Sequence, residues 1–277
     1  MSPLNDLSAL RRCVLAVSVL DDIDVAPHPE GFALGGDGGQ LVVWEPVARI
    51  IGRHDADSTV ARRRLADWLG LRLVMASDED AMSRLRATAR LLALPENHAS
   101  HPGNGWAREP VRGGVLQLGI GVVGLVRAPD EVVPLPPDVL DDPHLTDPWW
   151  PQLRDHAERM GALAAARLTR DGGSSGVLRP VGGVDALTLL ASRAVRRHLA
   201  ETDSTGMRAV AAPVRTRAWF DLTRIDPAFV GAAWVATDEW DRGLPRPLLV
   251  TVDEVGIARA GGDPYTGAFD PPRRPRH

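Results

Sequence analysis

A proline-rich stretch near the middle of the chain limits its fold more than any other feature. Residues 127–148 contain six prolines, and each proline lacks a backbone N–H donor and fixes its own φ angle. A long helix or a central strand cannot continue through such a stretch, so we expect an extended connector. This connector, residues 128–147, would join an N-terminal α+β lobe (residues 1–127) to a C-terminal α+β lobe (residues 148–277).

A second interpretation of the same stretch is open. It carries large apolar residues, and these would allow it to pack as a belt over one continuous core. Their burial would favour the belt, and their exposure would favour the connector. The apolar residues concerned are Val132, Val133, Leu135, Val139 and Leu140.

Hydrophobic spacing in the N-terminal part changes between helical and strand periods, which predicts an α+β fold. Apolar residues at helical spacing around Cys13 predict a first helix that buries this cysteine. A glycine-rich turn at residues 35–40 predicts a hairpin between its apolar flanks. The other expected elements are a helix at 58–69 ended by Gly70, a strand at 71–76, a helix from Ser77 to about Leu94, and one or two strands within 113–126.

The C-terminal part has the same mixture of patterns. Apolar residues spaced three and four apart predict helices at 148–170 and 185–200. Residues 214–253 read as strand, helix and strand, with Asp226-Pro227 as the helix start. If these residues form a β-α-β unit, its two strands are parallel.

Carboxylates end both strands of this expected unit. Asp221 would follow the first strand, and Asp253 and Glu254 the second. Parallel strands bring their carboxyl ends to one sheet edge, where open α/β sheets bind ligands. The three residues are therefore candidate catalytic groups that could hold Mg²⁺ or divide acid and base roles. The alternative is that each one only forms a turn or caps a helix.

Composition excludes several functional classes. The chain is 44% hydrophobic and 25% charged with a formal net charge of −4. These values are typical of a soluble globular protein and give no electrostatic reason to expect nucleic acid or a membrane as partner. All 32 lysine-plus-arginine residues are arginine, which excludes a lysine Schiff base and a Walker-type phosphate lysine. The single Cys13 suits a reducing compartment, so we expect a cytoplasmic protein.

Two glycine motifs resemble functional signatures but lack the required context. Gly119, Gly121 and Gly124 have the spacing of a dinucleotide fingerprint, but Pro129 arrives too soon for the helix that would bind the pyrophosphate. We interpret this segment as a bent, buried strand. The Gly-x-Ser-x-Gly pattern at residues 172–176 follows a helix and not a strand, so we interpret it as a loop. No cofactor is predicted.

Two histidines in a polar loop form a candidate metal site. His98 and His101 are three residues apart, and zinc binds imidazole and carboxylate groups. A third ligand would have to come from a distant residue such as Asp142 or His144. The alternative, which we favour, is a solvated loop whose histidines cap or hydrogen-bond the backbone.

Arg215, Arg217 and Trp219 alternate along one expected strand and would share a face. Two guanidinium groups beside an indole can hold a carboxylate or phosphate and stack on a planar group. The three residues are therefore candidates for binding a small anion. The alternative is a solvated strand surface.

Trp149 and Trp150 are adjacent at the start of an expected helix. Neighbouring helical positions point about 100° apart, so both indoles cannot enter one core. One of them should contact the other lobe, a second chain or water. We take the pair as a candidate interface with a protein partner or in a homo-oligomer.

Together these patterns favour a non-catalytic binding or accessory protein that recognises a protein partner or a small anionic ligand. The catalytic motifs lack their context, lysine chemistry is excluded, and one tryptophan should be exposed. The alternative is a hydrolase-like enzyme that uses a metal or carboxylates. Its active site would lie at Asp221, Asp253 and Glu254, or at His98 and His101.

Overall fold

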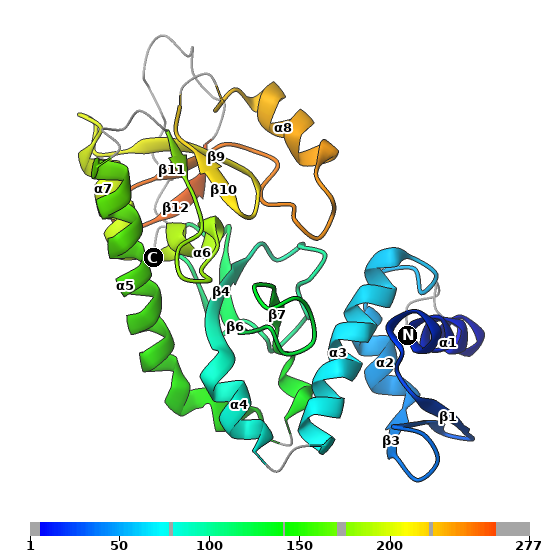
Figure 1. The fold of residues 1–277 in the computed structure, drawn as a ribbon. Coiled ribbons are helices and arrows are strands. Elements are labelled where there is room, and N and C mark those ends of the chain that lie inside the picture. Colours follow the sequence, from blue (N-terminus) through cyan, green and yellow to red (C-terminus); the bar gives the residue numbers. More distant parts are fainter. Residues whose placement is uncertain (1–5, 78–79, 141, 171–175, 222–223, 259–277) are drawn as a thin grey trace, which may run out of the picture.

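Eight α-helices, two 3-10 helices and three antiparallel sheets make up the described part of the chain (Figure 1). In this computed structural model the described residues are 6–77, 80–140, 142–170, 176–221 and 224–258. Helices and antiparallel sheets occur together, so the predicted α+β class is confirmed. Within these ranges no helix has both the length and the hydrophobicity that a membrane span requires.

The N-terminal part combines a small sheet with three helices. Its elements are α1 (Leu7–Asp21), β1 (Val25–His28), β2 (Gly31–Leu34), β3 (Gln40–Val43), α2 (Trp44–Ile51) and α3 (Thr59–Ser77). Helix α1 buries Cys13 as predicted, and the Asp6 side chain caps it by accepting a hydrogen bond from the Ala9 N–H at 2.7 Å. The predicted hairpin is formed by β2 and β3, which pair antiparallel.

Helix α3 is longer than the sequence predicted. It continues through Gly70 to Ser77, so the expected helix end at Gly70 and the expected strand at 71–76 are wrong. Gly70 does not end the helix but allows close packing against Val126, because a Cβ at this position would lie 2.9 Å from the Val126 Cγ1. The missing side chain lets α3 approach the segment that leaves the central sheet, and Leu71 extends the buried face of the helix.

The central sheet is built around β6. Its elements and the helix before it are α4 (Ala81–Thr88), β4 (Ala89–Leu94), β5 (Glu109–Pro110), β6 (Gln117–Val123) and β7 (Val132–Pro134). Strand β6 pairs antiparallel with the other three strands. The helix expected to reach Leu94 ends at Thr88, and the apolar residues after it form β4. The glycine segment forms strand β6, as interpreted. Gly119 is needed in this strand because a Cβ at its position would overlap the indole of Trp106.

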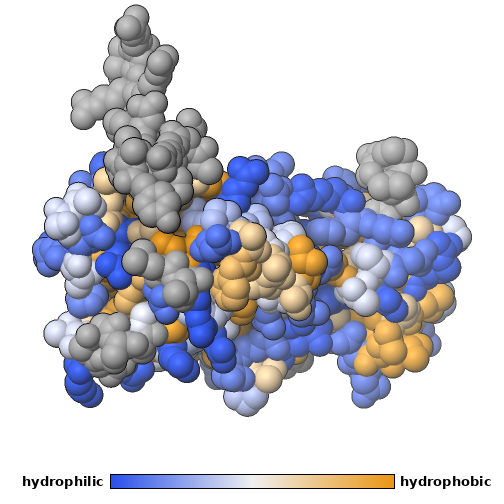
Figure 2. All heavy atoms as spheres, turned by 90° about the horizontal axis from the view of Figure 1, so that it is seen from above, coloured by the Kyte–Doolittle hydropathy of each residue, from blue (hydrophilic) through white to orange (hydrophobic). Residues whose placement is uncertain are grey.

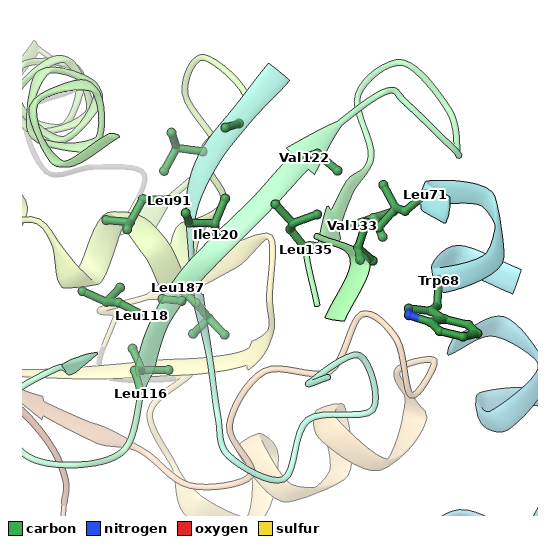
Figure 3. Close-up of a cluster of buried hydrophobic side chains, with 14 of the residues drawn as sticks. Trp68, Leu71, Leu91, Leu116, Leu118, Ile120, Val122, Val133, Leu135 and Leu187 are labelled. Carbon is green, nitrogen blue, oxygen red and sulfur yellow. The ribbon is translucent and has the colours of Figure 1, made fainter. Parts of the chain in front are cut away.

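The proline-rich stretch is packed against the core and contains short regular elements. Strand β7 pairs with β6, and η1 (Pro137–Val139) and η2 (Pro143–Trp149) follow. All five of its apolar residues named above are buried. Figure 3 shows Val133 and Leu135 between Leu71 of α3 and Ile120 of β6. This packing is what the belt alternative requires, and the division into two lobes remains a prediction.

The C-terminal part holds a five-stranded antiparallel sheet in the order β12-β11-β9-β10-β8. Its elements are α5 (Trp150–Arg170), β8 (Val177–Leu178), α6 (Ala186–Ala191), α7 (Arg193–Glu201), β9 (Arg208–Val214), β10 (Arg217–Trp219), α8 (Pro227–Ala236), β11 (Leu248–Val250) and β12 (Val255–Ile257). One cluster of buried residues extends from Ala9 in α1 to Val255 in β12. The core therefore includes residues on both sides of the proline-rich stretch.

Two expected elements of this part are each divided in two. The helix expected at 185–200 is interrupted at Ser192, where the Glu158 carboxylate accepts hydrogen bonds from the Ser192 hydroxyl at 2.9 Å and the Arg193 N–H at 2.8 Å. Glu158 therefore caps α7 from outside the helix. The strand expected to begin at residue 214 is part of a hairpin of β9 and β10 that turns at residues 215–216.

Candidate functional site

A cavity of about 890 Å³ lies where the N-terminal helices meet the central sheet and the proline-rich stretch. Its walls come from the end of α2 and the turn after it, from α3, from the loop after β4, and from the residues after β7. We call it the arginine cavity. Its basic and imidazole groups are Arg49, Arg53, Arg64, His54, His98 and His101.

Arg64 lines this cavity and lacks a counter-charge among the described residues. It lies four residues after Val60 and four before Trp68, which are both buried, so α3 directs it inward. Its guanidinium has no ion pair or hydrogen bond with any residue that the structure describes. Burial, and then the charge of Arg53, lower the pKa of Arg64 to about 10. A half-buried guanidinium without a protein acceptor is less well stabilised than a paired one, and an anion that enters the cavity would supply the missing acceptor.

The other two arginines differ in how they are compensated. The Arg53 Nη1 donates a hydrogen bond to the Asn97 side-chain oxygen at 2.9 Å, and this acceptor is neutral. Arg49 forms ion pairs with Glu45 at 3.0 Å and with Asp138 at 3.9 Å. Glu96 also lines the cavity. The cavity therefore has three guanidinium groups against two lining carboxylates, and the un-neutralised ones are Arg53 and Arg64.

The cavity histidines are kept neutral by their surroundings. Burial lowers the pKa of His54, and the charges of Arg64 and Arg53 lower it further. Burial also lowers the pKa of His101, with Arg64 acting in the same direction. The arginines thus create a positive potential that any bound anion would reduce.

His98 and His101 use both ring nitrogens within the protein. The His98 Nδ1 accepts hydrogen bonds from the Ser100 N–H at 3.0 Å, and its Nε2 lies 2.9 Å from the Arg242 carbonyl oxygen. The His101 Nδ1 accepts from the Gly103 N–H at 3.1 Å, and its Nε2 lies 2.9 Å from the Gln117 side-chain oxygen. Burial lowers the pKa of His98 to about 3. Both histidines therefore fix the loop conformation in their neutral form.

Hydrogen bonds within the protein already engage the two candidate metal ligands, His98 and His101. His98 and His101 do line one cavity, but their ring nitrogens are occupied. The suggested third ligands bond elsewhere: the Asp142 side chain accepts from the His144 N–H, and His144 pairs with Asp147. Among the described residues there is no group of three or more histidine, cysteine or acidic side chains that could hold a metal ion.

The carboxylates Asp221, Asp253 and Glu254 do not line the arginine cavity. Strands β10 and β11 run in the same direction, as expected, but β9 lies between them and pairs antiparallel with both. The expectation of a direct parallel pair is therefore wrong. Asp221 and Asp253 are exposed at the edge where both strands end. The Thr251 hydroxyl accepts from the Glu254 N–H at 3.1 Å, which is a turn contact.

The arginine–tryptophan face predicted on one strand does not form. Arg215 lies in the turn between β9 and β10 and is buried, with its Nε 3.1 Å from the Asp185 carboxylate. Arg217 is exposed and Trp219 is buried. Only two of the three residues share a strand, because the chain reverses at residues 215–216.

Trp149 and Trp150 point into different surroundings. Trp149 is buried in the main core. Trp150 is half-buried, and the guanidinium groups of Arg108 and Arg154 lie 5.9 Å and 5.6 Å from its ring centre. The two indoles thus diverge as helical geometry requires, and their role at an interface remains a prediction.

The residues of the arginine cavity that the sequence did not single out are Arg53, His54, Arg64 and Gln117. They come from the turn after α2, from α3 and from β6. One local signal was present, because Arg64 occupies an inward position between Val60 and Trp68. Comparison of the chain with protein-family models, curated proteins and solved structures gives no match.

Proposed function

We propose that this protein is a non-catalytic binding or accessory protein that holds a small anionic ligand in the arginine cavity. The observation that carries the proposal is the half-buried guanidinium of Arg64, which has no anionic partner among the described residues. Desolvating such a charge costs free energy, and a bound carboxylate or phosphate would offset that cost. The ligand therefore supplies the acceptor that the protein lacks.

The geometry also favours an anion of more than one charge. Arg53 and Arg64 are both without a carboxylate partner and are close enough for the charge of one to lower the pKa of the other. Guanidinium groups match phosphate and carboxylate oxygens in a bidentate arrangement. The cavity volume of about 890 Å³ falls within the range of small-molecule sites.

The experiment is a thermal-shift and calorimetric screen with phosphate, sulfate, succinate and a neutral sugar. We expect phosphate or succinate to stabilise the protein by about 2.7 kcal/mol at 100 times the dissociation constant. Arg64→Gln should abolish this effect, and Arg62→Gln on the same helix is the matched control because Arg62 does not line the cavity. Equal stabilisation of the wild type and Arg64→Gln would contradict the proposal.

A protein partner or a second copy of the chain is the other candidate, supported by the surface of α8. Phe229 and Val235 on this helix are 41% and 66% exposed. Figure 2 shows an apolar patch over this helix. Size-exclusion chromatography with light scattering over a concentration series tests this candidate. Phe229→Glu should shift any oligomer towards the monomer.

The hydrolase-like alternative has less support. Asp221 and Asp253 are exposed and line none of the cavities described here. Metal content after purification without chelators, together with a panel of phosphate-ester and carboxylic-ester substrates, tests it. Bound metal, or turnover lost in Asp253→Asn, would favour this alternative over the binding role.

A further inference from the structure

A second cavity, of about 430 Å³, adjoins the arginine cavity. We call it the α8 cavity. His54, Glu96, Asn97 and His98 line both cavities, so the two share one wall. Further lining of the α8 cavity comes from Trp234 of α8, from the loop before β11, from the segment before β6, and from Ile257 of β12.

The Arg242 charge in the α8 cavity is already compensated. Arg242 pairs with Glu239 at 3.3 Å, and its Nε donates to the backbone carbonyls of Trp234 at 3.1 Å and Thr237 at 3.0 Å. Its guanidinium also lies 4.5 Å from the ring centre of Trp234. An anion would therefore gain less binding free energy beside Arg242 than beside Arg64.

Apolar side chains form much of the remaining wall. Val115 and Trp234 are half-buried, Ile257 is 43% exposed, and Leu244 contributes from the turn. Apolar area that is exposed in a concave site gains free energy when an apolar group covers it. The two adjoining cavities thus differ in chemistry, because one holds un-neutralised cations and the other holds apolar surface.

We propose that the ligand is a phosphate monoester with an apolar chain, whose phosphate binds at Arg53 and Arg64 and whose chain lies in the α8 cavity. This inference rests on the anion-binding function proposed above. Two un-neutralised guanidinium groups match the double charge of a phosphate monoester better than a single carboxylate. The shared wall at His54 and Asn97 is where the ester linkage would cross from one cavity to the other. Burial lowers the pKa of His54, which keeps its imidazole neutral, so the charged side chain of the shared wall is Glu96.

The test is calorimetric titration of the full-length protein with methyl, butyl and octyl phosphate below their aggregation concentrations. Affinity should rise with chain length, by up to about fourfold for each methylene that is fully buried, until the chain fills the cavity. Octanoate and octyl sulfonate, which carry one charge, should bind more weakly than octyl phosphate. Equal binding of octanoate and octyl phosphate would overturn the phosphate assignment.

Variants separate the two halves of the site. Val115→Ser combined with Ile257→Ser should remove the dependence on chain length and leave methyl phosphate binding unchanged; neither side chain is fully buried, so the fold should be kept. Leu15→Ser on α1, at a position that is 60% exposed, is the control and should change nothing. Arg64→Gln should weaken every member of the series.

The outcomes distinguish this inference from the proposed function. If methyl phosphate binds through Arg64 but longer chains bind no better, the anion site stands and the apolar chain is wrong. If chain-length dependence survives in the Val115 and Ile257 double variant, the chain lies elsewhere and the inference is also wrong. If no phosphate binds at all, both proposals fail.

Discussion

The Asp185 carboxylate lies 3.1 Å from the Nε of Arg215, and both side chains are buried. Asp185 also caps α6, because its Oδ1 accepts a hydrogen bond from the Thr188 N–H at 2.8 Å. The Arg215 carbonyl in turn accepts from the Leu187 N–H at 3.3 Å. The pair thus joins the β9–β10 turn to the start of α6.

Asp185→Ala should strongly destabilise the protein. The substitution leaves the Arg215 charge buried without a partner and removes a helix cap, so we expect a loss of roughly 3–5 kcal/mol in the free energy of unfolding. Urea denaturation measures it. Asp57→Ala, which breaks the exposed ion pair with Arg12, is the control and should show no comparable loss. Similar losses of unfolding free energy in both variants would show that burial of the Asp185–Arg215 pair does not increase its effect on stability.

Arg64→Met should make the ligand-free protein more stable while it removes anion binding. The wild-type guanidinium is half-buried without an acceptor, and a methionine of similar length fills the same space with no charge to desolvate. We expect a gain of about 1 kcal/mol in the free energy of unfolding. Arg62→Met on the same helix should leave both stability and binding near wild type. A loss of stability in Arg64→Met would mean that the guanidinium is already satisfied in the free protein.

Local patterns in the sequence predicted those elements whose residues interact with near neighbours. The β2–β3 hairpin follows from the glycine-rich turn between its strands, and α1 follows from the apolar spacing around Cys13. The errors arose where a distant contact decides the outcome. Gly70 reads as a helix end, but it lies inside α3 because Val126, from another part of the chain, packs against it.

The candidate site could not be assembled from the sequence for the same reason. Arg53 and Arg64 approach each other through the packing of α2 on α3, and Gln117 joins them from β6. His98 and His101 were recognised because both lie in one loop. The expected backbone hydrogen bonds are present, but the expected solvation is wrong, because both side chains are buried. Adjacent residues can be grouped from spacing alone, whereas a cavity wall requires the tertiary packing.

Limited proteolysis tests whether residues 128–147 act as an exposed connector or as a belt. Val133 and Leu135 are buried against α3 and β6, so we expect thermolysin to cut first outside residues 132–140. Mass spectrometry of the early fragments locates the cuts. First cuts within residues 132–140 that leave two resistant pieces would restore the exposed connector between two lobes.

The tryptophan pair should respond unequally to substitution. Trp149→Ala removes a buried core aromatic and should cost roughly 3–5 kcal/mol. Trp150→Ala removes a half-buried ring beside Arg108 and Arg154 and should cost less. If Trp150 belongs to an interface, its substitution should also change the assembly state measured by light scattering. Equal large losses with no change in assembly would count against an interface role.

Asp67 sits at the centre of a charged cluster on the inner side of α3. The Nε of Arg127 donates to its Oδ1 at 2.5 Å, and the Nη1 of the same arginine donates to Asp21 at 3.0 Å. The Asp67 Oδ2 is buried and has no hydrogen-bond partner among the described residues. Burial raises the pKa of Asp67 from 3.8 to about 6, although Arg127 and Arg63 act in the opposite direction and Glu131 adds to the rise.

Asp67→Asn should therefore gain stability relative to the wild type as the pH rises from about 4 to 6. A raised pKa in the folded state means that folding favours the protonated form of Asp67. The contribution of Asp67 to the free energy of unfolding is therefore complete below pH 3.8 and is lost by about pH 6. The change should be about 3 kcal/mol at most. His98, whose pKa burial lowers to about 3, acts in the opposite direction over part of this range, so the difference between variant and wild type is the quantity to measure. Urea denaturation from pH 3.5 to 7.5 provides it, and a difference that does not change with pH would show that folding does not raise the pKa of Asp67.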